Sequence, residues 1–308
     1  MLDEFGRVAV LMGGLSSERK ISLLSGNAVL NALQKSGVDA VGIDTGEDFF
    51  TAISKESFDR AFIMLHGSFG EDGRVQAVLD LMNIPYTGSG HMASALAMDK
   101  VRSKLVWMAQ GLPTPEFELL HEGSDWAAVI ERLGPCFVKP VKDGSSLGIS
   151  QADHIQSLQE AFQHARQFDE LVMAESKIFG PEYTVPIVNR KVLPPIELRP
   201  KNAFYDYVAK YEADDTEYLC PCDLSEEEDL EIRSLSGEAY QLIGCEGWGR
   251  VDLMRDKEGK FWLLEINTVP GMTSHSLVPM SALAVGMSFE DLVLEILKTS
   301  MREQEQEA

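Results

Sequence analysis

Cysteine is scarce in this sequence: only four occur among 308 residues, at Cys136, Cys220, Cys222 and Cys245. Structural zinc sites usually draw on two closely spaced pairs of cysteines. Here Cys220 and Cys222 are separated by one residue, and no second pair lies nearby. The spacing argues against a structural zinc site and predicts buried free thiols.

Basic residues and long apolar runs are also few. The chain has 27 Lys and Arg and 49 Asp and Glu, which gives a net charge of −22. This negative charge opposes nonspecific binding to nucleic acid or to an anionic membrane. The longest stretch without a charged residue, Ile266 to Phe289, contains Pro270, His275 and Pro279, so a membrane span is a poor interpretation. The acidic start, Met1 to Glu4, lacks the basic region of a secretory signal. We expect a cytoplasmic protein with no nucleic-acid or membrane partner, in which local cations meet any anionic substrate.

The length suggests two domains or three compact lobes, and 44% hydrophobic residues are ordinary for a soluble globular chain. The first 90 or so residues alternate short apolar runs with helical patterns. The expected strands are 7–12, 40–43 and 61–65, and the expected helices are 21–33 and 75–82. This alternation predicts a small α/β lobe with parallel strands.

Beyond residue 90 the pattern is mixed. We expect helices at 92–98, 101–110, 155–168 and 226–243, and strands at 116–120, 136–139, 147–150, 171–175, 183–188 and 192–197. A hairpin of strands 249–255 and 261–267 follows. The stretch from Pro200 to Cys222 reads as irregular, and a long irregular segment in a compact protein usually indicates a functional lid.

The register of the hairpin can be predicted from its turn. If residues 256–259 form the turn, Arg250 lies opposite Glu265 and Asp252 lies opposite Leu263. Because side chains alternate between faces, Arg250, Asp252, Glu265 and Asn267 share one face. Two carboxylates and an amide oxygen suit Mg²⁺. The alternative is a solvated strand face with an Arg–Glu cross-strand pair.

A Gly/Ser-rich loop, 143–148, follows Lys139 at the end of a predicted strand. Its backbone amides could hold phosphates while the lysine supplies a point charge, although the loop lacks the ending of a P-loop. The same loop matches the G-x-S-x-G pattern, with Ser146 as a nucleophile, but a predicted strand follows it where that motif needs a helix. The G-x-G-x-x-A pattern at 88–93 lacks a strong preceding strand, which argues against dinucleotide binding.

Taken together, these segments resemble the D-alanine–D-alanine ligases of the ATP-grasp superfamily, from Val8 to Leu297. The matching stretches, in chain order, are Leu11-Met12-Gly13-Gly14 with Ser17-Glu18-Arg19, Leu65-His66-Gly67 with Gly70-Glu71-Asp72-Gly73, Tyr86-Thr87-Gly88-Ser89-Gly90, Met98-Asp99-Lys100, Phe204-Tyr205-Asp206-Tyr207 with Ala209-Lys210-Tyr211, Gly247-Trp248-Gly249-Arg250-Val251-Asp252 and the run from Glu265 to Ser276. Two positions depart from the pattern: Lys20 stands where relatives usually have an acid, and Lys177 where some have an aromatic residue.

The resemblance implies an α/β protein built of α+β lobes, with the ATP-grasp fold and an N-terminal parallel-sheet α/β lobe. The implied lobes are residues 1–90, 91–178 and 179–308, the last carrying the magnesium site and a lid loop, 200–222. ATP would lie between the second and third lobes and the amino acids between the first and third. The implied reaction joins two D-alanines through an acyl phosphate for peptidoglycan synthesis. Another carboxylate–amine ligase and a nucleotide-binding protein without turnover are the alternatives.

The resemblance also assigns the nucleotide and metal ligands. Those implied to bind ATP are Lys100, Lys139, Glu175, Ser176, Lys177, Ile178, Glu182, Phe204 and Lys210, with 175–178 at the adenine edge and Glu182 at the ribose. Those implied to bind two Mg²⁺, or Mn²⁺, are Asp252, Glu265 and Asn267. This metal set agrees with the hairpin face predicted from the register. A homodimer is the implied assembly.

The remaining implied residues act on the amino acids. Glu18 would pair with the ammonium of the first D-alanine near His66, although an acid at a helix start also has a purely structural explanation. Arg250 and Gly271 would form an oxyanion hole, and Lys210 would meet the transferring phosphoryl group. Ser276 and Leu277 would bind the carboxylate of the second substrate. Ser145 and Tyr211 would form a hydrogen-bonded network with Glu18.

Overall fold

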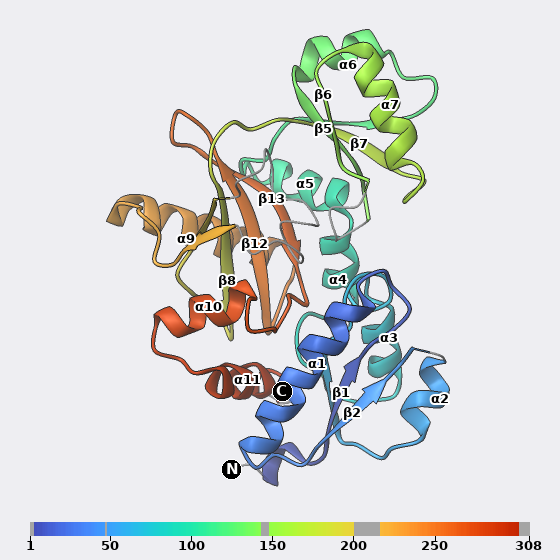
Figure 1. The fold of residues 1–308 in the computed structure, drawn as a ribbon, viewed down its shortest axis with the longest axis vertical. Coiled ribbons are helices and arrows are strands. Elements are labelled where there is room, and N and C mark those ends of the chain that lie inside the picture. The colour runs from blue at the N-terminus through green and yellow to red at the C-terminus, as the bar shows by residue number, and fades with distance from the viewer. Residues whose placement is uncertain (1–2, 47, 143–147, 200–215, 302–308) are drawn as a thin grey trace, which may run out of the picture.

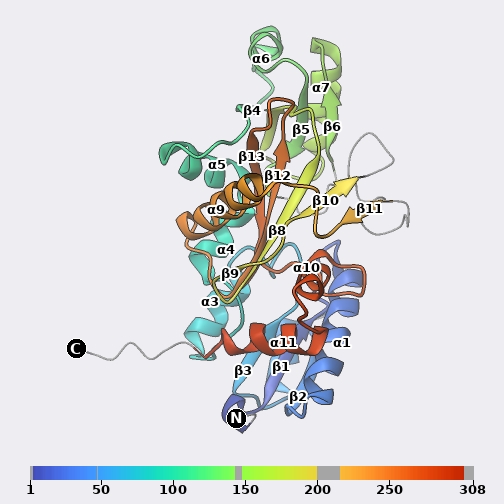
Figure 2. The same cartoon turned by 90° about the vertical axis from the view of Figure 1, so that its left-hand side faces the viewer.

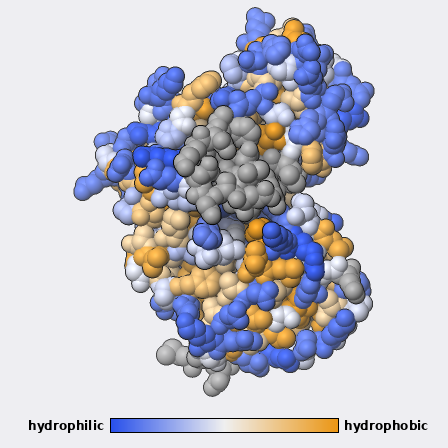
Figure 3. All heavy atoms as spheres, in the orientation of Figure 1, coloured by the Kyte–Doolittle hydropathy of each residue, from blue (hydrophilic) through white to orange (hydrophobic). Residues whose placement is uncertain are grey.

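The computed structural model describes residues 3–46, 48–142, 148–199 and 216–301. Figure 1 shows an elongated molecule with the N-terminal lobe at one end, the lobe of β4 to β7 at the other and a larger sheet between them. The space-filling view shows hydrophilic side chains over most of the lobe that carries α6 and α7 (Figure 3).

The N-terminal sheet has the order β2-β1-β3, and both pairings are parallel, which confirms the predicted α/β lobe. Its elements are a 3-10 helix at Asp3–Phe5, β1 (Val8–Met12), α1 (Arg19–Lys35), β2 (Ala40–Asp44), α2 (Phe49–Ser54), β3 (Arg60–Ile63) and α3 (Arg74–Leu81). Every residue of the central strand β1 is buried, as its unbroken apolar sequence requires. The six-residue helix α2 was not predicted, because so short a segment shows no helical period.

The lobe at the opposite end is an antiparallel sheet of order β4-β7-β5-β6. Its elements are β4 (Phe117–Leu120), α6 (Trp126–Leu133), β5 (Cys136–Pro140), β6 (Ser150–Ala152), α7 (Ile155–Ala165) and β7 (Val172–Ser176). The strand predicted at 147–150 begins only at Ser150. Gly148 has a φ of 74°, a left-handed conformation that a strand cannot contain.

The central sheet has the order β11-β10-β8-β12-β13, with β9 on β8. Its strands are β8 (Glu182–Val188), β9 (Lys191–Val192), β10 (Ile196–Arg199), β11 (Glu217–Leu219), β12 (Trp248–Arg255) and β13 (Phe261–Asn267). The strand predicted at 192–197 is two strands, because Pro194 and Pro195 cannot donate to a ladder. The stretch predicted as irregular contains β11, and its residues 200–215 lie outside the described ranges.

One face of the central sheet is apolar and covered by α9 (Glu226–Leu242), α4 (His91–Met98) and α5 (Lys100–Ala109) (Figure 2). Val251, Leu253 and Ile266 lie on this buried face. The indole N–H of Trp107 on α5 donates to the carbonyl of Ala239 on α9 at 3.1 Å and joins the covering helices. The opposite face is therefore the one available for polar side chains.

The predicted hairpin register is wrong in detail but right about the faces. Arg255 pairs with Phe261, so the connection has one residue more than predicted. A β-bulge between the pairs Leu253–Leu263 and Asp252–Glu265 then adds a second residue. Asp252 lies directly opposite Glu265, and Arg250 opposite Asn267. Because the two shifts sum to an even number, all four side chains remain on one face.

Two C-terminal helices that were not predicted, α10 (Leu277–Ala284) and α11 (Phe289–Lys298), follow the hairpin. Helix α11 packs against α1 and adds Leu292, Val293, Ile296 and Leu297 to the N-terminal core. No single helix in the described parts of the chain is long and apolar enough to cross a membrane. Helices α10 and α11 pass that test only as a pair, and they bend by 105° where they meet.

Candidate active site

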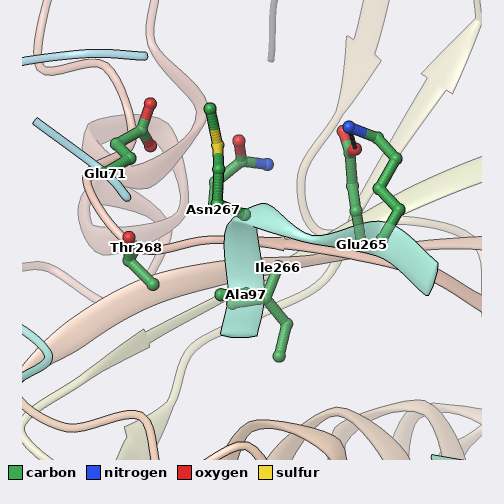
Figure 4. Close-up of a pocket in the computed structure, with 8 residues that line it drawn as sticks. Glu71, Ala97, Glu265, Ile266, Asn267 and Thr268 are labelled. Atoms are coloured by element: carbon green, nitrogen blue, oxygen red, sulfur yellow. Dashed lines mark ion pairs between the residues drawn. The ribbon is translucent and has the colours of Figure 1, made fainter. Parts of the chain in front are cut away.

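A pocket opens where β13 passes the junction of α4 and α5 (Figure 4). Its lining consists of Glu71, Ala97, Met98, Lys100, Glu265, Ile266, Asn267 and Thr268. Glu265 and Asn267 project from the same side of β13, and Ile266 points away from them (Figure 4). The pocket thus brings the polar face of the hairpin next to Glu71 of the N-terminal lobe.

The predicted metal ligands lie together on this face. Arg250 donates to both oxygens of Asp252, at 2.8 and 2.7 Å, and Asn267 donates to Asp252 at 2.9 Å. Glu265 forms an ion pair with Lys100 at 3.1 Å, and Arg250 pairs with Asp252. Within the described part of the chain, the Arg250–Glu265 cross-strand pair expected for a solvated strand face is therefore not formed. Among the described residues no group of three or more His, Cys, Asp or Glu side chains could hold a metal ion. The predicted set is two carboxylates and one amide, a donor chemistry that fits Mg²⁺.

The carboxylate of Glu175 lies between two lysines in the buried interior near the end of β7. It forms ion pairs with Lys139 at 2.7 Å and with Lys104 at 2.5 Å. Burial raises the pKa of Glu175, but the two ammonium groups outweigh burial and hold the pKa below its ordinary value. Glu175 and Lys139 were predicted from the sequence, whereas Lys104 was not.

The signal that could have revealed Lys104 is its place in the helical pattern of α5. It lies three residues after Val101 and three before Trp107, and both of these are buried. A lysine at helical spacing within an apolar stripe must have buried partners, because an unpaired buried ammonium is costly. Burial lowers the pKa of Lys104 to about 8.

The segment predicted to meet adenine follows Glu175. The backbone N–H groups of Ser176 and Lys177 donate to the carbonyls of Glu116 and Pro135, both at 2.8 Å, so they already have protein partners. The ammonium of Lys177 lies 5.5 and 5.2 Å from the rings of Phe137 and Phe179. The next backbone N–H along the chain is that of Ile178, and Glu182 begins β8.

Glu18 occupies the N-cap position of α1, but its side chain makes no capping hydrogen bond. One of its carboxylate oxygens lies 2.5 Å from where a Cβ on Gly67 would be, so any larger residue at 67 would clash. Gly67 also has a φ of 66°, which favours glycine. Glu18 is buried and faces the loop after β3, which favours the ligand-binding hypothesis over the structural one.

His66, in the same loop, is a neutral imidazole. Its Nδ1 lies 2.7 Å from the carbonyl of Val269, so Nδ1 carries the proton and Nε2 is an acceptor. Burial, with a smaller contribution from the nearby Arg250, lowers the pKa of His66 to about 4. The buried Nε2 has no hydrogen-bond partner among the described residues. It is available to accept a hydrogen bond from an ammonium group beside Glu18.

Glu71 links this loop to the loop after β13, a role that the sequence alone did not reveal. It accepts hydrogen bonds from the N–H of Gly67 at 2.6 Å and from that of Val269 at 3.3 Å. Burial and the neighbouring Glu18 raise the pKa of Glu71 to about 8. Glu71 is therefore largely protonated at neutral pH, and the loops of His66 and Val269 are held together.

Gly271 and Ser276 are neighbours in the loop before α10. A Cβ on Gly271 would lie 2.9 Å from the hydroxyl of Ser276, which accepts from the N–H of Thr273 at 2.9 Å. The N–H of Met272 donates to Ser25 of α1 at 3.0 Å, which anchors the loop to the N-terminal lobe. Leu277 packs its side chain against Ile196 and Leu198, so only its backbone is placed to reach a ligand.

Four predicted residues, Ser145, Phe204, Lys210 and Tyr211, and the alternative nucleophile Ser146 lie outside the described ranges. All four cysteines are free, as predicted. Cys136 and Cys245 are buried, whereas Cys220 and Cys222 are only partly so. Burial raises the pKa of Cys136 to about 11 and those of Cys222 and Cys245 to about 12. Thiols in this state are poor nucleophiles.

Two family descriptions match the chain: "D-ala D-ala ligase C-terminus" over residues 106–298 and "D-ala D-ala ligase N-terminus" over residues 46–89. The chain is 54% identical over 298 residues to a D-alanine–D-alanine ligase of Ectopseudomonas mendocina, covering 96% of this chain and 95% of the relative. It is 52% identical over 301 residues to one of Laribacter hongkongensis, covering 97% and 98%.

The fold is also similar to solved structures of ligases. A D-alanine–D-alanine ligase of Bacillus anthracis complexed with ATP has a TM-score of 0.85 at 32% identity, covering 96% of this chain and 98% of that one. The VanG D-Ala:D-Ser ligase of Enterococcus faecalis has a TM-score of 0.83 at 29% identity, covering 96% and 99%.

Proposed function

This chain belongs to the D-alanine–D-alanine ligase family and has its ATP-grasp fold, and we propose that it joins two D-alanines into D-alanyl-D-alanine for peptidoglycan precursors. The observation that carries the proposal is sequence identity above 50% along nearly the whole chain. Two ends of one site, a cationic end and an end lined by buried carboxyl groups, support it.

The reaction requires activation because a carboxylate is a poor electrophile. The γ-phosphoryl group of ATP passes to a carboxylate oxygen of the first D-alanine, and ADP leaves. The amine nitrogen of the second D-alanine then attacks the acyl carbon, loses its proton, and inorganic phosphate leaves. Negative charge develops on oxygen in both steps, so fixed cations lower both barriers. In a chain with a net charge of −22, those cations must be local.

At the nucleotide end, Lys139 and Lys100 would hold the phosphates. Each forms an ion pair in this structure, with Glu175 and Glu265 respectively. Segment 175–178 would meet the adenine edge, where Ile178 offers a backbone N–H, and Glu182 would bind the ribose hydroxyls. Phe204 would cover an adenine face.

Asp252, Glu265 and Asn267 would hold two Mg²⁺ ions, or Mn²⁺. The ions would neutralise charge on the phosphate oxygens and orient the transferred group. In this structure Oδ1 of Asp252 accepts from Arg250 and Thr184, and Oδ2 accepts from Arg250 and Asn267. A bound metal ion would take the place of some of these donors.

At the amino-acid end, Glu18 would pair with the ammonium of the first D-alanine, and Nε2 of His66 would accept a hydrogen bond from that ammonium. Arg250 and the backbone N–H of Gly271 would stabilise the oxyanion. Ser276 and the backbone of Leu277 would bind the carboxylate of the second D-alanine, at the start of α10.

The remaining parts of the proposal rest on the family resemblance. Lys210 would meet the transferring phosphoryl group, and Ser145 and Tyr211 would hold Glu18, under a lid formed by 200–222. The lobes 1–90, 91–178 and 179–308 would enclose the substrates, and two chains would form a homodimer. The cytoplasm is the compartment that supplies the ATP.

The test is phosphate release measured with ATP, Mg²⁺ and one acceptor at a time: D-alanine, L-alanine, D-serine or D-lactate. We expect release with D-alanine and formation of D-alanyl-D-alanine, detected by chromatography. A higher rate with D-serine would move the chain toward the activity named for the Enterococcus faecalis relative. ATP binding without release in any reaction would leave a nucleotide-binding protein and refute the proposal.

A further inference from the structure

Lys104 is the most deeply buried ammonium group beside the proposed nucleotide site. Its side chain has no exposed surface, and its charge is met by Glu175 at 2.5 Å. It also donates to the hydroxyl of Thr114 at 2.7 Å and to the carbonyl of Leu263 at 3.3 Å. An ammonium has three donors, and three acceptors surround it. So complete a set of partners offsets the cost of burying the charge.

The three partners belong to three different segments. Glu175 lies on β7, Thr114 lies on the segment between α5 and β4, and Leu263 lies on β13. Thr114 itself donates to the carbonyl of Leu263 at 2.8 Å, and the N–H of Leu263 donates to the carbonyl of Pro113 at 2.9 Å. Leu263 immediately precedes the bulge that carries Glu265 to the polar face. Lys104 therefore joins the sheet bearing Lys139 to the sheet bearing Glu265.

The charges around Glu175 show what this contact does. With Lys139 alone, Glu175 would form a neutral pair, and its carboxylate would compete with a phosphate for Lys139. With Lys104 on the other oxygen, the three groups carry a net charge of +1. The positive charge of Lys139 is then only partly neutralised by Glu175, so Lys139 can still attract an anion. The effect is strong because the groups are buried, where charges are poorly screened.

We propose that Lys104 is a positioning residue of the nucleotide site: it balances the charge of Glu175 so that Lys139 can bind the nucleotide phosphates, and it fixes β7 to β13. This inference rests on the proposed function, since it assumes that Lys139 meets the phosphates of ATP. Lys104 itself lies beneath Glu175 and touches no substrate.

The test compares ATP with adenosine, measured by calorimetric titration of the full chain. Lys104→Met keeps the length of the side chain and removes its charge. We expect it to weaken ATP binding about tenfold or more, because Glu175 then draws on Lys139 alone, and to change adenosine binding less than about twofold. Lys35→Met is the matched control: it removes an equal charge from an exposed lysine on α1 and should leave both affinities unchanged.

Thr114→Val is the second variant, for the case in which Lys104→Met does not fold. It removes one acceptor of Lys104 at nearly constant volume, and we expect ATP binding to weaken about threefold with adenosine unchanged. If a folded variant loses affinity for ATP and adenosine equally, Lys104 has a merely structural role and the proposal is overturned. Unchanged ATP affinity would overturn it as well. These titrations need no turnover. Phosphate release by the unaltered enzyme therefore tests the proposed function separately.

Discussion

Glu71 and Glu175 are two buried glutamates at opposite ends of the proposed site, and their pKa values move in opposite directions. Glu71 has a carboxylate, Glu18, as its neighbour, and its pKa rises to about 8. Glu175 has Lys104 and Lys139 as neighbours, and its pKa falls. Burial alone disfavours charge at both positions, so the difference comes from the partners. The same residue type is a largely neutral link between loops at the proposed amino-acid end and a carboxylate at the proposed nucleotide end.

The largest effect should come from Glu265, which lies between the two ends and pairs with Lys100. Glu265→Gln should lower kcat by about 100-fold or more, because an anionic oxygen ligand becomes neutral where phosphate charge must be neutralised. The measurement is phosphate release at saturating ATP, D-alanine and Mg²⁺. Glu258→Gln, in the exposed connection of the same hairpin, is the control and should retain normal turnover. Near-normal kcat for Glu265→Gln would contradict the metal assignment.

The contrast between Glu71 and Glu175 is tested by replacing each of them with glutamine. Glu175→Gln should lower the free energy of unfolding by about 3 kcal/mol at pH 7, because two buried lysines lose their anion. Glu71→Gln should cost no more than about 1 kcal/mol, because the side chain it replaces is already largely uncharged and the variant avoids the cost of protonating a glutamate at pH 7. Urea denaturation of both variants gives the two values. Equal losses would mean that Glu71 is ionised in the folded protein.

The pH dependence of stability sharpens the same contrast. The folded-state pKa of Glu71, about 8, lies above the ordinary value of 4.5 for a glutamate, so the folded protein holds a proton that the unfolded chain releases. The stability from this group is complete below the unfolded pKa and is lost as pH rises toward 8. Between pH 6.5 and 8 the loss approaches about 1.4 kcal/mol per pH unit. Urea midpoints at these two pH values should differ less in Glu71→Gln than in the parent. If the urea midpoint changes with pH equally in the parent and in Glu71→Gln, the pKa of Glu71 is not raised.

The smallest effect should come from Lys177, at the rim of the nucleotide end. Lys177→Met removes an ammonium that lies over the rings of Phe137 and Phe179 and should cost about 1 kcal/mol of stability or less. The KM for ATP should change less than about threefold. Lys257→Met, which removes a cation 5.7 Å from the ring of Phe179, is a matched comparison with a smaller expected effect. A tenfold rise in KM for ATP would instead give Lys177 a direct role.

The sequence predicted the parallel N-terminal lobe and the shared face of Arg250, Asp252, Glu265 and Asn267, because apolar periodicity and strand alternation are local signals. It did not predict the bulge at the hairpin. That bulge is held by Thr114 and Lys104, which reach Leu263 from distant positions in the chain. Lys104 and Glu71 were missed for the same reason, since their roles depend on partners that only tertiary packing supplies. The short helix α2 was missed because six residues show no helical period.

The packing of α11 against α1 has a consequence for how the chain is made. Leu292, Val293, Ile296 and Leu297 complete the core around β1, yet nearly the whole chain separates them from it in order of synthesis. A ribosome therefore releases the first lobe with part of its apolar core uncovered, and that surface stays uncovered until the last helix emerges. During translation the N-terminal lobe therefore exposes apolar surface to aggregation and to chaperone binding, and a truncation before α11 would leave that surface uncovered.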